Sequence, residues 1–418
     1  MLFRNRKREA RLLEAMKKER PSQGYWRRVW TEYKKNRMAL WALRILLFLI
    51  FIALTADFLA NDKPIYCKLD GQTHWPIFKN FAVQSGWSKW PDGLATFDWQ
   101  KAEYESVVWP LIPYADNNVD ISNYLKGPFE EQSVQSPRFR HRLGTDGVGR
   151  DVAAGMIKGT RVAIFVGVLA MLIAAFIGIF FGAIAGYFGD KGLRLSRARL
   201  LLNAIGLVLA YFYAIVARRY QLSSGEGLYT ELLISLLIAL GILLFVNLLS
   251  RPLEKIPFLG HRHAIAVDLL VMRFVEVMNS IPGLLLLLAI LVLVPKPTIF
   301  VVMVIIGMIS WTGITRFIRA EILRVRNLEY IEAARAMGYK DRRIIWRHAI
   351  PNALGPVLIT IAFGIAGAIL LEAFLSFLGQ GVGIENLTWG RMLSLARSNF
   401  SAWWLAVFPG FAIFLTVS

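Results

Sequence analysis

Acidic and basic side chains gather in one short segment, EYIEAARAMGYKDRRIIWRHAIPNALGP, which runs from Glu329 to Pro356 between two long apolar runs. Ala333 and Ala334 follow Glu332 and have small side chains, so another protein could approach this backbone closely. A helix seated in a groove is the natural binding mode for such a surface, and that chemistry is non-covalent. A loop hairpin that packs against its own helix bundle accounts for the same residues equally well.

The pattern also predicts how this segment folds. Apolar residues recur at helical spacing at positions 318, 322, 325 and 328, which predicts one amphipathic helix from Arg316 to Met337 that continues out of an apolar run. Gly338 suits the left-handed end of that helix. Asp341 is expected to cap a second short helix over Arg342 to Ala349, and Pro351 is expected to stop it.

Motifs for catalysis, phosphate binding and metal binding are missing from the sequence. Without a GxxxxGK[ST] loop the chain is not expected to bind or hydrolyse ATP, and the glycines of residues 144–149 do not form a dinucleotide-binding GxGxxG. Cys67 is the single cysteine, which excludes an internal disulfide. His261 and His263 lack the further ligands of a metal site. We therefore predict a chain that is not an enzyme and that holds no metal or cofactor.

Composition and charge indicate a polytopic membrane protein. Of the 418 residues 56% are apolar, and the formal net charge is +19. Residues 1–37 contain 13 Lys and Arg against 4 Asp and Glu, whereas residues 61–140 contain 8 against 10. Basic charge that is concentrated beside apolar runs follows the positive-inside rule, so it does not require nucleic acid as a partner, and we expect none.

Eight apolar runs are candidates to span a bilayer, which needs roughly 20 apolar residues of helix. They are residues 38–60, 162–187, 198–217, 228–249, 282–294, 298–314, 353–374 and 403–418. The fifth is short alone, but its helix can begin near Asp268 and bend at Pro282. Residues 191–263 then form a hairpin of two spans.

The distribution of charge predicts the orientation of these spans. We expect a cytoplasmic N-terminal segment, residues 1–37, followed by an anchor helix over 38–60. Residues 61–158 then lie outside, where they form either a small folded domain or an interfacial layer of aromatic side chains. Arg218 and Arg219 fall on the outside as well, and they break the pattern.

A family resemblance rests first on six residues: Glu332, Ala333, Ala334, Gly338, Ile350 and Pro351. They resemble the EAA loop of binding-protein-dependent ABC importer permeases, in which the loop forms a coupling helix that seats in a cleft of the ATPase subunit. RHAIPNA at 347–353, LGTDGVGRDV at 143–152, LSFLGQGV at 375–382 and TWG at 388–390 resemble further motifs of the dipeptide and oligopeptide permeases. Residues 60–76 look like the enlarged external domain of the microcin C and oligopeptide branch.

The resemblance implies an all-α polytopic membrane protein with the transmembrane domain of a type I ABC importer. Six core helices would be joined by the inserted pair at 191–263, and residues 268–418 would form the permease core with its EAA coupling loop at 316–352. The family usually continues past the last span with a charged tail. The sequence stops at Ser418 within that span, so we expect a truncation there.

The implied function is that of a permease subunit in an ATP-driven importer of peptides, whether oligopeptide, dipeptide or microcin C-like, in a bacterial inner membrane. Its partners would be a second permease subunit, ABC ATPase subunits that bind ATP and Mg, an extracytoplasmic peptide-binding protein and membrane lipids. The resemblance makes Glu332 the charged contact with the ATPase, while Arg335, Lys340, Arg342 and Arg343 serve equally well as positive-inside residues.

Four further residues on the outer side are candidates for gating or docking. Asp146, Arg150 and Asp151 could lock the outer face against the binding protein or the partner permease, but a local capping role is equally plausible. Glu372 either lines the path or sits at the water boundary. An ion-coupled secondary transporter would need ionisable residues at mid-membrane, and Glu372 is its sole candidate. A membrane-embedded enzyme lacks a His, Asp and Ser constellation.

Overall fold

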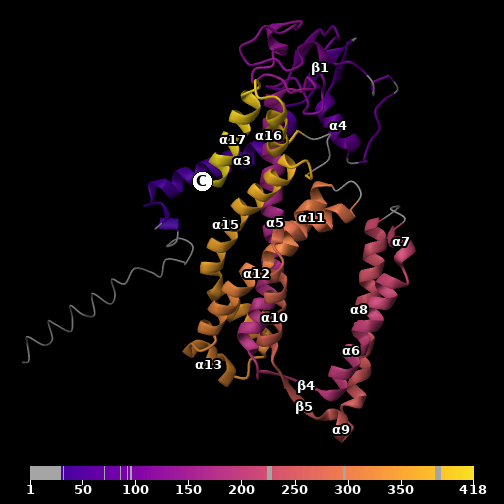
Figure 1. Cartoon of the computed structure of the whole chain (residues 1–418), viewed down its shortest axis with the longest axis vertical. Helices are drawn as coiled ribbons and strands as arrows, with labels where there is room; N and C mark the ends of the chain where they lie inside the picture. The colour runs from indigo at the N-terminus through magenta and orange to yellow at the C-terminus, as the bar shows by residue number, and fades with distance from the viewer. Residues whose placement is uncertain are drawn as a thin grey trace, which may run out of the picture. The chain divides into compact units, whose positions relative to one another are not determined.

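The structure is a computed structural model that describes residues 30–31, 33–69, 71–84, 86–91, 93–94, 97–223, 228–294, 298–381 and 387–418. The segment expected at residues 1–37 therefore lies mostly outside the described residues. The chain divides into two compact units, and Figure 1 labels its helices and strands. Unit 1 takes its residues from 1–167, 296–302 and 369–418, and unit 2 takes its residues from 168–295 and 303–368.

Six helical runs in the described ranges are long and apolar enough to cross a membrane. They are Arg37–Leu59, Val152–Phe188, Arg197–Val216, Thr230–Leu253, Ile299–Val325 and Asp341–Phe377. The predicted polytopic helical fold is confirmed, and each of the eight apolar runs falls on helix. α10 (Val267–Ser280) and α11 (Gly283–Leu293) are bent by 78°, which agrees with the kink predicted at Pro282. The last run forms α17 (Trp404–Val417), which is 14 residues long.

Helices α5 (Val152–Phe188) and α12 (Ile299–Val325) approach each other closely within unit 2. Three glycines of α5 at four-residue spacing face isoleucines of α12 at the same spacing: Gly178, Gly182 and Gly186 against Ile314, Ile318 and Ile322. A Cβ added to Gly182 would lie 2.0 Å from Cγ2 of Ile318 and 2.6 Å from the Thr315 carbonyl oxygen. Small residues at this spacing let two membrane helices approach closely and gain van der Waals contact.

Charged side chains connect the ends of the spans within each unit. In unit 1 the Asp57 carboxylate of α3 (Arg37–Leu59) pairs with Lys158 and, at 2.7 Å, with Arg161 of α5. In unit 2 Asp268, in the first turn of α10, accepts two hydrogen bonds from the guanidinium of Arg319 on α12. Both pairs join neighbouring helices at polar positions, where unpaired charges would be costly.

The predicted inserted hairpin, residues 191–263, forms between two short antiparallel strands that the sequence patterns did not predict. β4 (Leu193–Ser196) pairs with β5 (Arg262–Ile265), with Leu193 opposite Ile265. Between them lie α6 (Arg197–Tyr211), a π-helical turn over 212–216, α7 (Arg219–Ser223), α8 (Leu228–Leu253) and α9 (Pro257–Gly260), visible in Figure 1. α6 packs against α8, and the side-chain amides of Asn203 and Asn247 bond each other reciprocally at 3.0 and 3.4 Å.

Arg218, which broke the positive-inside pattern, is paired in the folded chain. Its guanidinium forms an ion pair with Glu231 of α8 and donates to the Ser235 hydroxyl at 3.1 Å. The pair contributes no net charge to this end of the hairpin. The charge of Arg218 is thus satisfied within the hairpin itself.

The outer segment of unit 1 has a packed core of its own. β1 (Tyr66–Leu69), β2 (Gln72–His74) and β3 (Ser106–Val108) form an antiparallel sheet in the order β2-β1-β3, and the segment also contains α4 (Pro76–Gln84). Cys67 on the central strand is fully buried and packs with Trp99 and Trp109. Burial raises the pKa of the Cys67 thiol, so the thiol stays protonated and behaves as a small apolar group.

The glycine contact gives a direct test of the helix packing. Gly182→Leu should destabilise the protein by more than about 2 kcal/mol, because α5 would have to move away from α12 along the whole contact. Thermal unfolding of the detergent-solubilised protein would measure this loss. Gly313→Leu on α12 is the matched control, since a Cβ at that position meets nothing within 4 Å. Equal loss in the two variants would contradict the proposed packing.

Candidate functional site

The segment singled out by its charges forms a short helix and a tight turn in unit 2. α12 ends at Val325, and α13 (Glu329–Ala336) follows after three residues, so the single predicted helix is broken at 326–328. Gly338 closes α13 with a φ of +76°, the left-handed conformation that its position predicted. The motif thus occupies a compact knob, the EAA knob, which we define as residues 326–349.

The prediction that Pro351 stops a helix is wrong. α14 (Asp341–Ile344), a π-helical turn over Ile345–Ala349 and α15 (Ile350–Phe377) form one uninterrupted run. Proline removes one donor and crowds the carbonyl four residues before it, but the wider π turn accommodates this ring and lets the helix continue. Residues 341–349 of the knob are therefore a direct extension of α15.

Asp341 also differs from its predicted role. It lies inside the first turn of α14, and the capping position belongs to Lys340, whose side chain makes no cap hydrogen bond. The Asp341 carboxylate instead accepts a hydrogen bond of 2.7 Å from the hydroxyl of Tyr187, at the end of α5. A carboxylate in the first turn of a helix is also stabilised by the helix dipole. Asp341 therefore both accepts the hydrogen bond from Tyr187 and stabilises the start of α14.

Tyr187 is the residue that braces the EAA knob against the transmembrane helices of unit 2. The Arg335 guanidinium lies over its ring at 5.0 Å from the centroid and donates to its hydroxyl at 3.4 Å. Arg326 extends the same contact, because its Nη1 donates to the Gly186 carbonyl oxygen at 2.9 Å. Three side chains of the knob thus hold the last turn of α5.

The two faces of α13 differ sharply in exposure. Ile331 and Ala334 are buried, at 0% and 2% exposed, whereas Glu332 and Ala333 are exposed. Of the predicted coupling residues, Ala334 therefore packs inward, and Glu332 with Ala333 present an outward surface of one charge and one small side chain. Gly338 is exposed and has no atom within 4 Å of an added Cβ. At the base of the knob, Ile350 is buried and Pro351 is exposed.

The basic residues of the knob cluster beside a shallow cavity of about 430 Å³. Arg342, Arg343 and Arg347 line it together with Lys340 and the half-exposed Trp346. Arg343 also lies over the Tyr339 ring at 4.5 Å. The outward surface of the EAA knob thus combines one acidic helix with a basic and aromatic rim.

The outer candidates Asp146 and Arg150 lie in a tight loop before α5 and contact each other. The Asp146 carboxylate accepts hydrogen bonds from the backbone N–H groups of Val148 and Arg150, each at 2.9 Å, and from Nε of Arg150 at 2.7 Å. Gly149 adopts a φ of +90°, and an added Cβ would lie 2.1 Å from the Asp120 carbonyl oxygen, so only glycine fits. The motif fixes its own loop in this way.

Asp151 stands directly before α5 and is joined to a buried histidine. Its Oδ1 accepts from the Ala154 N–H at 2.6 Å, and its Oδ2 lies 2.8 Å from Nδ1 of His141. Nε2 of His141 lies 3.4 Å from the Asp120 carboxylate, and the Tyr114 ring stacks on the imidazole at 4.2 Å. Only the doubly protonated ring donates to both carboxylates.

Asp120 is held in its charged form by these contacts. Burial alone would raise the pKa of its carboxyl, but hydrogen bonds from Asn123 and His141 lower the pKa below its ordinary value. Together with Asp151 it forms a buried bridge between the loop at 120–123 and the start of α5. This bridge holds the two segments together.

The second outer motif packs on the first. α16 (Trp389–Ser398) places the Trp389 indole against Gly159 and donates from its Nε1 to the Met156 carbonyl oxygen at 3.1 Å. α17 donates from Nε1 of Trp404 to the Thr145 carbonyl oxygen at 3.0 Å. Segments more than 200 residues apart in the sequence are thus joined within unit 1. The last residue of the LSFLGQGV motif, at position 382, and the four residues that follow it lie outside the described residues.

Glu372 lies on α15 in unit 1 and is buried, with 2% of its surface exposed. Its Oε1 accepts a hydrogen bond from the Ser376 hydroxyl one turn later, at 2.7 Å. The described ranges contain no group of three or more His, Cys, Asp or Glu side chains that could hold a metal ion.

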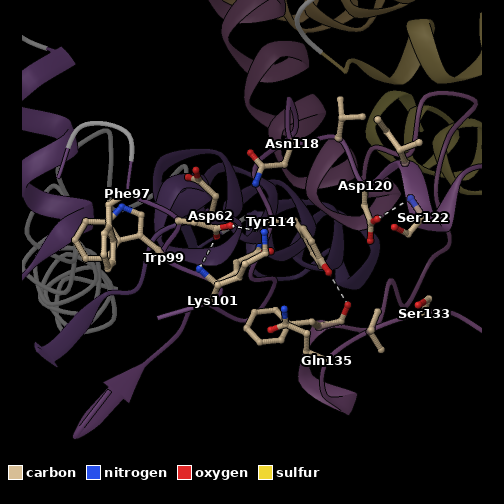
Figure 2. A pocket seen from close by; sticks show the side chains of 16 residues that line it. Asp62, Phe97, Trp99, Lys101, Tyr114, Asn118, Asp120, Ser122, Ser133 and Gln135 are labelled. Carbon is tan, nitrogen blue, oxygen red and sulfur yellow. Dashed lines mark hydrogen bonds and ion pairs between the residues drawn. The ribbon is translucent and has the colours of Figure 1, made fainter. Parts of the chain in front are cut away.

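The outer segment of unit 1 also contains a cavity of about 590 Å³, shown in Figure 2. Trp99, Tyr114 and Phe97 contribute aromatic walls, and Asp62 and Asp120 contribute carboxylates. The Tyr114 hydroxyl donates to the Phe139 carbonyl oxygen at 2.6 Å and is thereby already engaged. The acids are likewise bound within the protein, since Asp62 pairs with Lys63 at 3.1 Å.

Sequence comparison places the EAA knob in its family. Residues 258–418 match the family described as "Binding-protein-dependent transport system inner membrane component". Residues 24–79 match the "N-terminal TM domain of oligopeptide transport permease C". The chain belongs to the permeases of binding-protein-dependent transport systems. It is a multi-pass inner membrane protein of a family that works with ATPase and binding-protein partners.

The permease is similar to several characterised relatives over most of its length. It is 27% identical over 417 residues to the peptidoglycan transport system permease protein YejE of Agrobacterium fabrum, which covers 94% of this chain and 87% of the relative. It is 27% identical to the inner membrane ABC transporter permease protein YejE of Escherichia coli (93% and 90% covered). It is 25% identical to the dipeptide transport system permease protein DppC of Bacillus subtilis (97% and 84% covered).

Two residues that organise the permease escaped the sequence analysis. Tyr187 carried one signal, a hydroxyl in the last turn of an otherwise apolar run, where a partner beyond the run would be expected. His141 carried none, because Asp120 and Asp151 are brought to it only by the folded loops. Patterns of spacing identify residues on one element, and both of these residues act between elements.

If Tyr187 braces the EAA knob, removing its hydroxyl group should lower the local stability of the knob. Tyr187→Phe deletes the hydroxyl that joins Arg335 to Asp341 and should cost about 1 kcal/mol of local stability. Amide hydrogen exchange over residues 326–341 should accelerate about fivefold, while exchange in the β1–β3 sheet stays unchanged. Tyr213→Phe, at an exposed position of the inserted hairpin, is the control. Unchanged exchange in the knob of Tyr187→Phe would show that the brace is dispensable.

Proposed function

We propose that this permease is one of two non-identical membrane subunits of an ATP-driven ABC importer that carries peptides into the cytoplasm. The observation that carries the proposal is the EAA knob, a braced projection whose outward helix face bears Glu332 and Ala333 within the family's matched region. The printed names of the relatives, which include dipeptide and oligopeptide transport permeases, support peptides as the cargo.

Coupling would run from the EAA knob into the spans. A partner ATPase that closes on ATP would push α13, and the push would pass through the tight turn at Gly338 into the run from Asp341 to Phe377, which has no break before the end of α15. The Tyr187 brace would carry the same displacement into α5. Movement of these helices relative to the second permease would then switch the pathway between inward-facing and outward-facing states.

Each predicted coupling residue has a physical role in this proposal. Glu332 offers the charge that pairs with a basic group of the ATPase, and Ala333 allows close approach beside it. Ala334 and Ile350 pack inward and hold the knob in shape, while Gly338 makes the turn. Pro351 begins the span on the exposed side of the same run.

The remaining partners follow from the same proposal. ATP and Mg would be bound by the ATPase subunits, since this chain has no phosphate-binding loop and would hydrolyse nothing itself. An extracytoplasmic peptide-binding protein would deliver cargo to the outer side near Asp146, Arg150 and Asp151, and Glu372 would lie close to the outer pathway. The basic residues 1–37 would be cytoplasmic, and lipids would cover the apolar faces of the spans.

The energy source is tested by uptake of a labelled tripeptide into vesicles that contain the complete transporter. Uptake should require ATP on the cytoplasmic side and should persist when an ionophore collapses ion gradients. Ion coupling through Glu372 would produce the opposite result, in which uptake continues without ATP and stops with the ionophore. That result would refute the ATP-driven importer.

The coupling surface is tested by reversing one charge. Glu332→Lys should reduce ATP-dependent uptake at least tenfold, because an exposed contact with a basic partner group becomes repulsive. Insertion into the membrane should be normal, since the side chain packs against nothing inside the protein. Glu329→Lys reverses a charge in the same first turn outside the motif triplet and serves as the control. Wild-type uptake by Glu332→Lys would remove this residue from the coupling surface.

A further inference from the structure

A cavity of about 540 Å³ opens where the two outer motifs of unit 1 meet. Residues of the loop before α5, including Val148 and Arg150, form one side, and α16 forms the other with Arg391 and Leu395. The two sides are more than 200 residues apart in the sequence. The size lies within the range of sites that bind small molecules.

The polar groups around this cavity favour an anion. Arg150 and Arg391 line it together with Asn117 and Asn399, and none of the described residues that line it carries a carboxylate. Arg150 is balanced by Asp146, which it contacts through Nε at 2.7 Å. Arg391 has no ion pair among the described residues. The cavity therefore carries one positive charge that no described residue neutralises.

Arg391 also has a buried donor without an acceptor. Its Nε is shielded from solvent and has no hydrogen-bond partner within the described ranges. A shielded N–H of a charged group that lacks an acceptor costs free energy, and an anion that enters beside it recovers that cost. The observation is independent of the cavity's shape and indicates an acceptor that is supplied from outside.

The position of Arg391 is fixed by its helix. The Thr388 hydroxyl accepts a hydrogen bond from the Arg391 backbone N–H at 3.3 Å, which caps the ten-residue α16. Gly390 packs so closely on α15 that an added Cβ would lie 2.2 Å from the Ala373 carbonyl oxygen. The guanidinium thus projects from the first turn of a rigid helix, where the helix dipole also favours negative charge.

We propose that this cavity binds the C-terminal carboxylate of a peptide on the outer side of the permease. The planar guanidinium of Arg391 would hold the carboxylate in a bidentate manner. The amides of Asn117 and Asn399 would bond the adjacent peptide group, and Val148 with Leu395 would contact its side chain. The inference rests on the proposed function, since it takes the transported peptide as the ligand.

Binding is measured on the full-length permease, purified with the subunits that copurify with it and placed in lipid nanodiscs. The probes are labelled tri-alanine and tri-alanine amide, which differ in the C-terminal group alone. The free acid should bind at least about tenfold more tightly than the amide, as expected for hydrogen bonds to a charged group. Arg391→Gln should weaken binding of the acid by about tenfold and leave binding of the amide unchanged.

Arg397→Gln is the matched control, because Arg397 lies on the same helix with its guanidinium over the Phe377 ring, away from the cavity. It should bind the acid as the wild type does. Equal binding of acid and amide, or wild-type binding by Arg391→Gln, overturns the proposal. So does a defect of Arg391→Gln in docking the external binding protein with unchanged peptide binding, which would assign the cavity to an acidic side chain of that protein.

ATP-dependent uptake of tri-alanine shows whether a failure concerns only the carboxylate site or also the proposed function as an importer. If wild-type vesicles take up the peptide with ATP but Arg391→Gln binds it normally, the carboxylate site alone fails. If wild-type vesicles take up no peptide under any energy source, the proposed function fails as well.

Discussion

The close contact of α5 with α12 is the constraint on which the candidate coupling site depends. Gly182 permits an approach that no larger residue allows, and the glycine at 186 brings the last turn of α5 beside Ile322. Tyr187 follows at once, so its hydroxyl reaches Asp341 and Arg335 because the helix beneath it is held close. The coupling proposed for the knob would need such a rigid base, since a contact that yields would absorb the displacement.

Helix α5 carries a functional feature at each end. Its first turn is fixed by Asp151, which belongs to the buried bridge through His141, and its last turn braces the EAA knob. Neither end relies on a flexible linker, because both are hydrogen-bonded to neighbouring segments of their own unit. One continuous element therefore takes part in both the loops before its first residue and the EAA knob beyond its last.

Much of the fold and part of the site follow from the sequence, and the reasons for the failures are physical. Apolar runs locate the spans because the bilayer imposes length and composition on each helix separately. Gly338 was predictable because a left-handed turn selects for glycine. The continuation of the helix through Pro351 was not predictable, since a π turn in the preceding residues removes the clash that normally ends a helix. The strands β4 and β5 pair across more than 60 residues, and His141 contacts carboxylates 10 and 21 residues away, which local patterns do not encode.

The pairing of β4 with β5 has a consequence for how this chain differs from a plain six-span permease. Leu193 stands opposite Ile265, so the chain leaves the core and returns to it at neighbouring points. The segment between β4 and β5 can therefore be longer, shorter or absent without moving α5 and α10. Insertions into proteins are tolerated for the same reason when the two ends of the inserted domain lie close together. The hairpin is thus a self-contained module, attached through one narrow stem, and its gain or loss in a lineage would leave the transport core intact.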